Sequence, residues 1–134
     1  MMIKHFSDLE AWQVARDLAL NVYRASKSFP PEEVCGMRKQ LRDAVISITA
    51  NIAEGFGRYH YKENLNFLYD ARGSLAETES FIMLAHDLEY LDEPTCQPLR
   101  ELCQQELRVL NGYIKAVRAK MQAGEVHPGD STTK

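Results

Sequence analysis

Two amphipathic segments meet at a short glycine-containing break, and this feature restricts the possible folds more than any other. Before the break, apolar residues recur at spacings of three and four from Met37 to Phe56, which predicts a helix with one buried stripe. Gly55 and Gly57 can adopt positive φ, and Arg58 complements the negative end of a helix dipole. We therefore expect the helix to end at these glycines.

After the break, a predicted helix of residues 61–91 carries apolar side chains on more than one face. Its main stripe consists of Leu65, Leu68, Ala71, Leu75, Thr78, Ile82 and Ala85. Phe67, Phe81 and Leu88 lie beside or across from that stripe, and one partner helix covers only about a third of a helix circumference. These residues are therefore predicted contacts between copies of the chain. Gly73 interrupts the helix at a cost of about 1 kcal/mol, and we expect a close helix approach to compensate.

Another helix is predicted near the N-terminus. Ser7 and Glu10 form a capping-box pattern, so this helix should begin near Asp8. It should end by Phe29, because Pro30 restricts the conformation of the residue before it. Its apolar stripe consists of Ala11, Val14, Ala15, Leu18, Val22 and Ala25.

The starts of two helices have more than one candidate. The helix before the break begins either at the acidic pair Glu32 and Glu33 or, about one turn later, at Met37. The last helix is capped by Asp92 or by Thr95. The stripe of the last helix consists of Leu99, Leu102, Cys103, Leu107, Leu110, Ile114, Val117 and Met121.

The helices and their short links predict one fold class. Four amphipathic helices favour an all-α, antiparallel up-down-up-down four-helix bundle over residues 1–122, and no strand or repeat pattern competes. The link over residues 55–61 is short enough to impose an antiparallel hairpin. Residues 123–134 are polar and aperiodic, which predicts a mobile tail.

Composition indicates a cytoplasmic protein that does not enter a membrane. The N-terminus lacks the apolar core of a signal peptide, and no segment has 18 uninterrupted apolar residues. Cys35, Cys96 and Cys103 form neither an even set nor a CxxC pair, so we expect reduced thiols. With a formal net charge of −3, any site for a polyanion must be local.

Catalytic and metal-binding patterns are missing from the sequence. A di-iron bundle needs Glu-x-x-His pairs, but Met2, Gly57, Met83 and Gly124 stand three residues before the four histidines. A phosphate-binding loop and a nucleophile elbow are missing too. We therefore predict no catalytic, cofactor-binding or metal-ligating residues and no enzyme activity. An enzyme whose site forms only between subunits is the alternative.

Polar residues on both sides of the break have two interpretations. Folding the hairpin about residue 59 or 60 brings Ser47 near Arg72 and Arg42 near Glu77. One interpretation is an active site, and the other is a polar network that fixes the register of the hairpin. We favour the network, because no pair of nucleophile and base is present.

Two groups of basic residues are candidates for contact with nucleic acid, and the group in the last helix is the stronger one. Arg108, Lys115, Arg118 and Lys120 follow one another in the last helix without an intervening acid. The alternative is a solvated helix end whose positive charges complement the dipole. A second basic group consists of Arg38, Lys39 and Arg42.

The residues around the break resemble a known family. The segments from Ser47 to Arg58 and from Phe67 to Glu77 are similar to those of the bacterial 23S rRNA intervening-sequence proteins, also called four-helix-bundle proteins. The motif residues are Ser47, Asn51, Glu54, Gly55, Gly57, Arg58, Arg72, Gly73 and Glu77, for which we predict structural roles. The resemblance implies a small cytosolic bundle that forms a homo-pentamer, and it makes RNA or DNA a candidate partner. Our leading hypothesis is a non-enzymatic homo-oligomer that acts as a binding or scaffold protein. The alternative is a nucleic-acid-binding protein that uses the basic residues of the last helix.

Overall fold

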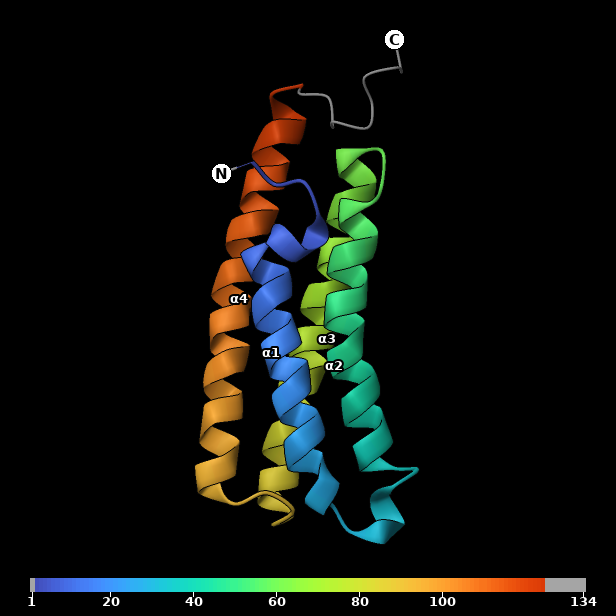
Figure 1. The fold of residues 1–134 in the computed structure, drawn as a ribbon, viewed down its shortest axis with the longest axis vertical. Coiled ribbons are helices and arrows are strands. Elements are labelled where there is room, and N and C mark those ends of the chain that lie inside the picture. The colour runs from blue at the N-terminus through green and yellow to red at the C-terminus, as the bar shows by residue number, and fades with distance from the viewer. Residues whose placement is uncertain (1, 125–134) are drawn as a thin grey trace.

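The computed structural model describes residues 2–124 and contains four α-helices and no strand in that range (Figure 1). The helices are α1 (Glu10–Ala25), α2 (Met37–Phe56), α3 (Tyr61–Asp87) and α4 (Glu93–Gln122). Short 3₁₀ helices at Phe6–Asp8, Ser26–Ser28 and Pro31–Glu33 precede α1 and connect it to α2. The all-α prediction is confirmed. Residues 125–134 of the predicted tail lie outside the described range.

The four helices lie side by side, and each contacts its neighbours in chain order. α2 packs most extensively on α3, α3 packs on α4, and α1 contacts both α2 and α4. In Figure 1 the link between α2 and α3 lies at the end of the molecule where α4 ends, and the other two links lie at the opposite end. No helix within residues 2–124 is long and apolar enough to cross a membrane.

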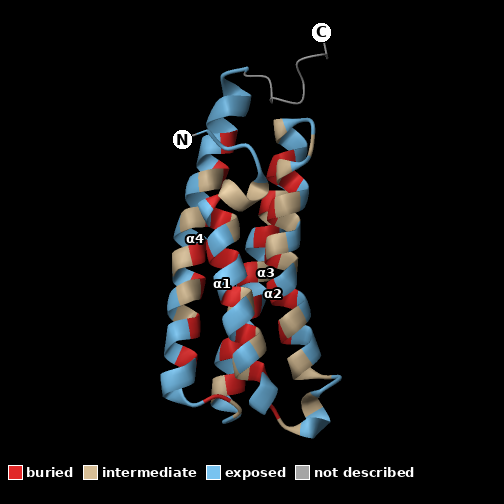
Figure 2. Cartoon of the chain, in the orientation of Figure 1, coloured by how far each residue is buried: buried red, intermediate tan, exposed pale blue. Residues whose placement is uncertain are grey.

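The core lies between the helices and contains most of the predicted stripes (Figure 2). Every residue of the main α3 stripe is buried. Cys96 and Cys103 are buried free thiols, and burial raises the pKa of Cys103 to about 12, so these cysteines are packing residues. Cys35 is exposed and also free.

The start of α1 differs from the prediction. His5 and Asp8 make the capping box: the Nδ1 atom of His5 accepts from Ser7 N at 3.2 Å, and Asp8 accepts from His5 N at 3.0 Å. This box closes the 3₁₀ helix Phe6–Asp8, and α1 begins after Leu9 without a side-chain cap. The Ser7–Glu10 prediction was wrong because a tighter turn precedes the helix and takes over the capping.

The start of α2 is the later of the two candidates. Glu33 lies in the preceding 3₁₀ helix, and its carboxylate accepts from Met37 N at 3.0 Å and from the Tyr90 hydroxyl at 2.8 Å. These hydrogen bonds lower the pKa of Glu33. The acidic residue thus stabilises the start of the helix from outside it.

The end of α2 does not use the conformational freedom of glycine. Gly57 is the C-cap, yet its φ of −79° is accessible to any residue. Positive φ occurs in the described chain only at Glu89 and Gly124. Gly55 is needed for a different reason: a Cβ there would lie 2.7 Å from Asn64 Oδ1 and 3.0 Å from Phe67 Cβ.

α4 begins at the first of its two predicted caps, and its buried face differs from the predicted stripe in a few residues. Asp92 is the N-cap and accepts from Thr95 N at 2.9 Å. Leu107 and Met121, both predicted to be buried, are 42% and 39% exposed, whereas Glu106 is fully buried. The buried face of α4 therefore includes Glu106.

Candidate functional site

Hydroxyl and amide groups join the middle of α2 to α3. Ser47 Oγ accepts from Asn51 Nδ2 and from Ser74 Oγ, both at 2.9 Å, and Thr78 Oγ1 donates to the Ser74 carbonyl at 2.8 Å. The partners of Ser47 are neutral, so neither can serve as a general base. The geometry fits a network that fixes the register of the hairpin. The predicted partner Arg72 was wrong, because Ser74 takes that position.

Arg42 was also assigned to the wrong partner. Its Nε donates to Ser26 Oγ at 2.8 Å and its Nη2 to the Tyr23 carbonyl at 3.0 Å. The guanidinium also lies 4.5 Å from the centroid of the Tyr23 ring. Arg42 therefore ties α2 to the end of α1, while its predicted partner Glu77 is exposed on α3.

Three further motif residues, Glu54, Gly55 and Arg58, pack the closed end of the hairpin. Gly55 allows α2 to lie directly against Asn64 and Phe67 of α3. Arg58 pairs with Glu54 at 2.9 Å and lies 4.7 Å from the centroid of the Phe67 ring. These roles are structural.

The outer side of α3 is open along its length. A Cβ added at Gly73 would meet nothing within 4 Å, so the predicted close helix approach does not occur within the chain. Phe67 and Phe81 are half-buried, and Leu84 and Leu88 are 45% and 47% exposed. Phe81, Leu84 and Leu88 follow at spacings of three and four, which places them on one face of α3. We call these last three residues the outer α3 patch.

Two arginines and one tyrosine gather between α3 and α4. The guanidinium carbons of Arg72 and Arg118 lie 5.4 and 5.9 Å from the centroid of the Tyr69 ring. Arg72 Nη1 also donates to Asn111 Oδ1 at 3.0 Å. This arrangement presents two cations around one aromatic ring.

The four predicted basic residues of α4 do not form one cluster. All are exposed. Arg118 belongs to the group beside Tyr69, but Arg108 lines a shallow pocket next to α1 that it shares with Glu10. Lys120 lines a different cavity, at the end of the molecule.

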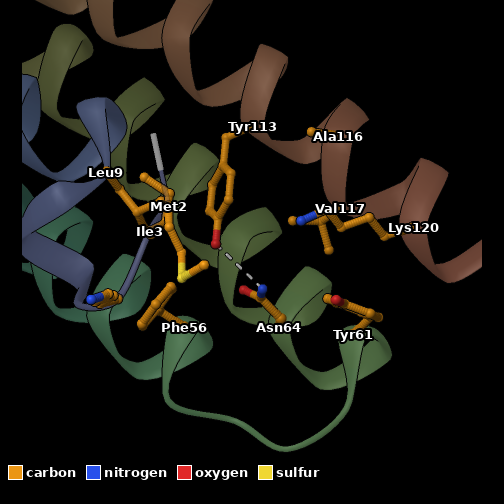
Figure 3. A pocket seen from close by; sticks show the side chains of 11 residues that line it. Met2, Ile3, Leu9, Phe56, Tyr61, Asn64, Tyr113, Ala116, Val117 and Lys120 are labelled. Carbon is orange, nitrogen blue, oxygen red and sulfur yellow. Dashed lines mark hydrogen bonds between the residues drawn. The ribbon is translucent and has the colours of Figure 1, made fainter. Parts of the chain in front are cut away.

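That cavity was missed by the sequence analysis, because its walls come from four separate segments. It has a volume of about 450 Å³ and lies between the N-terminal residues, the α2–α3 link and the last turns of α4 (Figure 3). Its apolar walls are formed by Met2, Ile3, Leu9, Phe56, Tyr61 and Val117. The size is in the range of small-molecule sites. We call it the end cavity.

Polar groups reach the end cavity from α3 and α4. Asn64 is 2% exposed, and its Nδ2 donates to the Tyr113 hydroxyl at 3.5 Å, which is at the limit for a hydrogen bond. Asn64 Oδ1 is buried without a partner in the described chain. Burial raises the pKa of Tyr113, which keeps its hydroxyl neutral. Lys4 and Lys120 also line the cavity, and none of the lining residues in the described range is acidic.

Glu106 is the other unusual polar residue. Its side chain is fully buried, and both carboxyl oxygens lack a hydrogen-bond partner among residues 2–124. Desolvation, with a smaller effect of Glu10, raises the pKa of Glu106 to about 9, so the carboxyl is protonated at neutral pH. Its spacing from Cys103 and Leu110 matches the buried face of α4, but a search for apolar residues selects Leu107 instead.

Groups that could hold a metal ion do not gather in the described residues. No three histidine, cysteine, aspartate or glutamate side chains within residues 2–124 lie close enough to hold a metal ion. His86 Nε2 lies 3.0 Å from Glu93 Oε2, across the link between α3 and α4.

Comparison with known proteins identifies relatives of this fold. The model of the family described as 23S rRNA-intervening sequence protein matches residues 7–112. A crystal structure of a protein of unknown function from the S23 ribosomal protein family of Bacteroides thetaiotaomicron has a TM-score of 0.72 and 22% sequence identity, and the match covers 78% of this chain and 98% of that chain. At this identity the likeness shows the fold alone. A search of curated proteins finds no match.

Proposed function

The chain belongs to the 23S rRNA-intervening sequence protein family, and from this premise we propose that it is a non-enzymatic protein whose copies assemble with one another. Each copy is an up-down-up-down bundle, and five copies form a ring in the cytoplasm. The ring acts as a binding or scaffold protein. The subunit number comes from the family resemblance, whereas the need for a partner surface comes from the chain itself.

The outer α3 patch supports the assembly. Leu84 and Leu88 leave nearly half of their surface in water, and Phe81 beside them is half-buried. Burying one such side chain completely contributes about 1.5 to 3 kcal/mol. Gly73, on the same helix, has open space where another helix backbone could approach closely. A second copy of the chain would cover apolar surface that the single bundle leaves in water.

Light scattering coupled to gel filtration tests this proposal. We expect the native protein to elute with a mass of five times the 15.3 kDa chain at micromolar concentration. The double variant Leu84→Glu and Leu88→Glu should give a folded monomer, because charges would be buried at the contact. Leu20→Glu is the matched control, since Leu20 of α1 is also 47% exposed but lies outside the patch. A native protein that runs as a monomer would overturn the proposal.

The cluster around Tyr69 supports a second candidate function, the binding of RNA or DNA. Arg72 and Arg118 could each contact a phosphate while the ring stacks on a base, and Lys115 is exposed one turn before Arg118. Replacing Arg72, Lys115 and Arg118 by Gln should lower affinity for single-stranded RNA, with the salt slope falling by about 0.7 for each lost phosphate contact. The exposed Arg16 of α1 provides the control substitution. If affinity and slope stay unchanged, this site is excluded.

A further inference from the structure

We propose that the end cavity binds an amphipathic organic anion. The ligand has an apolar, partly aromatic body, a single N–H or O–H donor within that body, and an acidic group at one end. This binding goes beyond the assembly proposed above, because residues of a single chain line the cavity.

The walls of the cavity select the apolar body of the ligand. Met2 and Ile3 come from the N-terminal segment, Phe56 and Tyr61 from the two sides of the α2–α3 link, and Val117 from α4. Figure 3 shows the Tyr113 ring extending between these walls toward Asn64. Aromatic and aliphatic side chains therefore surround about 450 Å³ of space. Such a space favours a molecule with fused or linked rings over a polar metabolite.

The Asn64 amide selects the donor. Its Oδ1 atom is buried and has no partner in the described chain, although nearly all buried polar atoms in folded proteins are hydrogen-bonded. The amide lies at the cavity wall beside the Tyr113 hydroxyl (Figure 3). Oδ1 packs against Gly55, so a ligand N–H or O–H reaches it once the amide turns toward the cavity, and the Tyr113 hydroxyl can accept or donate a second bond.

The charges at the rim select the acidic group. Lys4 and Lys120 line the cavity, and no carboxylate of residues 2–124 lines it. Asp8 lies four residues after Lys4, and its Oδ2 already accepts from the backbone N–H groups of Lys4 and His5, both at 3.0 Å. Lys120 is exposed at the rim, where its ammonium can pair with an anion that enters the cavity.

Two fluorescent probes test the assignment, because they differ only in the acidic group. 1-Anilinonaphthalene-8-sulfonate carries a sulfonate, and N-phenyl-1-naphthylamine has the same rings and N–H without it. Titrated into the full-length protein, both probes should bind with one site per chain. Lys120→Gln should weaken binding of the sulfonate by about tenfold and leave the neutral probe within about twofold. Ala116→Trp, which places a large ring at the cavity wall, should abolish binding of both.

The controls separate this site from the assembly surface. The double variant Leu84→Glu and Leu88→Glu changes only the outer α3 patch, so it should retain both affinities whether or not the protein assembles. If the Ala116→Trp protein has native circular dichroism and still binds the probes, the proposal is overturned. Binding that is lost only in the Leu84→Glu and Leu88→Glu double variant would overturn it too. If Ala116→Trp does not fold, Lys120→Gln decides: equal effects on both probes, or none on either, would exclude recognition of an anion here.

Discussion

The buried carboxyl of Glu106 should make the stability of this protein depend strongly on pH. Its pKa is raised from 4.5 to about 9 in the folded protein. Between these values the folded state holds a proton that the unfolded chain has released, so the free energy of unfolding decreases as pH rises. The contribution is complete below the unfolded pKa and is lost as pH rises toward the folded pKa. The expected slope is about 1.4 kcal/mol per pH unit, which amounts to about 4 kcal/mol between about pH 5 and about pH 8.

Replacement of Glu106 by Gln isolates this contribution. The amide has nearly the same shape and is neutral at every pH, so the variant should match the native protein near pH 5. As pH rises, the free energy of unfolding of the variant should exceed that of the native protein by about 1.4 kcal/mol more for each pH unit. The assay is urea unfolding followed by circular dichroism at several pH values and one fixed protein concentration, because assembly would make stability concentration-dependent. The difference between the two proteins cancels every other titrating group.

Two further variants strengthen the test. Glu101→Gln changes an exposed glutamate on the same helix, and it should follow the native protein at every pH. Glu106→Leu removes both unpaired oxygens and should stabilise the protein even near pH 5, by about 1 to 3 kcal/mol. A difference between Glu106→Gln and native protein that stays constant with pH would refute the reasoning, because the carboxyl would then be solvated or paired in solution.

Three smaller effects follow from single contacts and can be measured by thermal unfolding. Gly55→Ala should destabilise the protein by about 1 to 3 kcal/mol, because the new methyl group collides with Asn64. Gly73→Ala meets open space and should stabilise the helix by up to about 1 kcal/mol. Equal effects of the two substitutions would contradict the packing described for Gly55. Arg42→Gln should cost about 1 to 2 kcal/mol through lost hydrogen bonds between α2 and α1, and a neutral result would place those bonds in solvent. Asp92→Ala should lower the melting temperature at neutral pH, because it removes the N-cap of α4. The difference in melting temperature should shrink in acid, since hydrogen bonds from Thr95 lower the pKa of Asp92 below 3.8 and the native carboxylate is protonated only there. A difference that persists in acid would mean that the carboxylate is not the cap.

Residue types and their spacing were enough to predict the helices. The stripe of α3 from Leu65 to Ala85 is buried as predicted, because an amphipathic helix has only one way to remove its apolar face from water. The prediction failed where a polar residue took an interior position. Leu107 is apolar and Glu106 is charged in water, yet the geometry of α4 buries Glu106, which becomes neutral.

Pairings between helices were predicted less well than the helices themselves. Ser47 and Arg42 were expected to contact α3 residues at fixed distances from the hairpin turn, but Ser47 bonds Ser74 and Arg42 bonds α1. The long arginine side chain can reach either neighbouring helix, so sequence distance from a turn does not select its partner. The rotation of each helix about its axis makes that selection.

The sequence by itself determined the class of fold, the number of helices and the family, since periodicity and motif residues are local properties of the chain. Only the tertiary structure decided which surfaces and cavities exist. The end cavity brings together Ile3, Asn64 and Val117, which are far apart in the sequence, and no local pattern marks them as neighbours. The physical reason is that periodicity assigns a residue to a face of its helix, whereas the packing of all four helices determines whether that face meets a neighbour, a cavity or water.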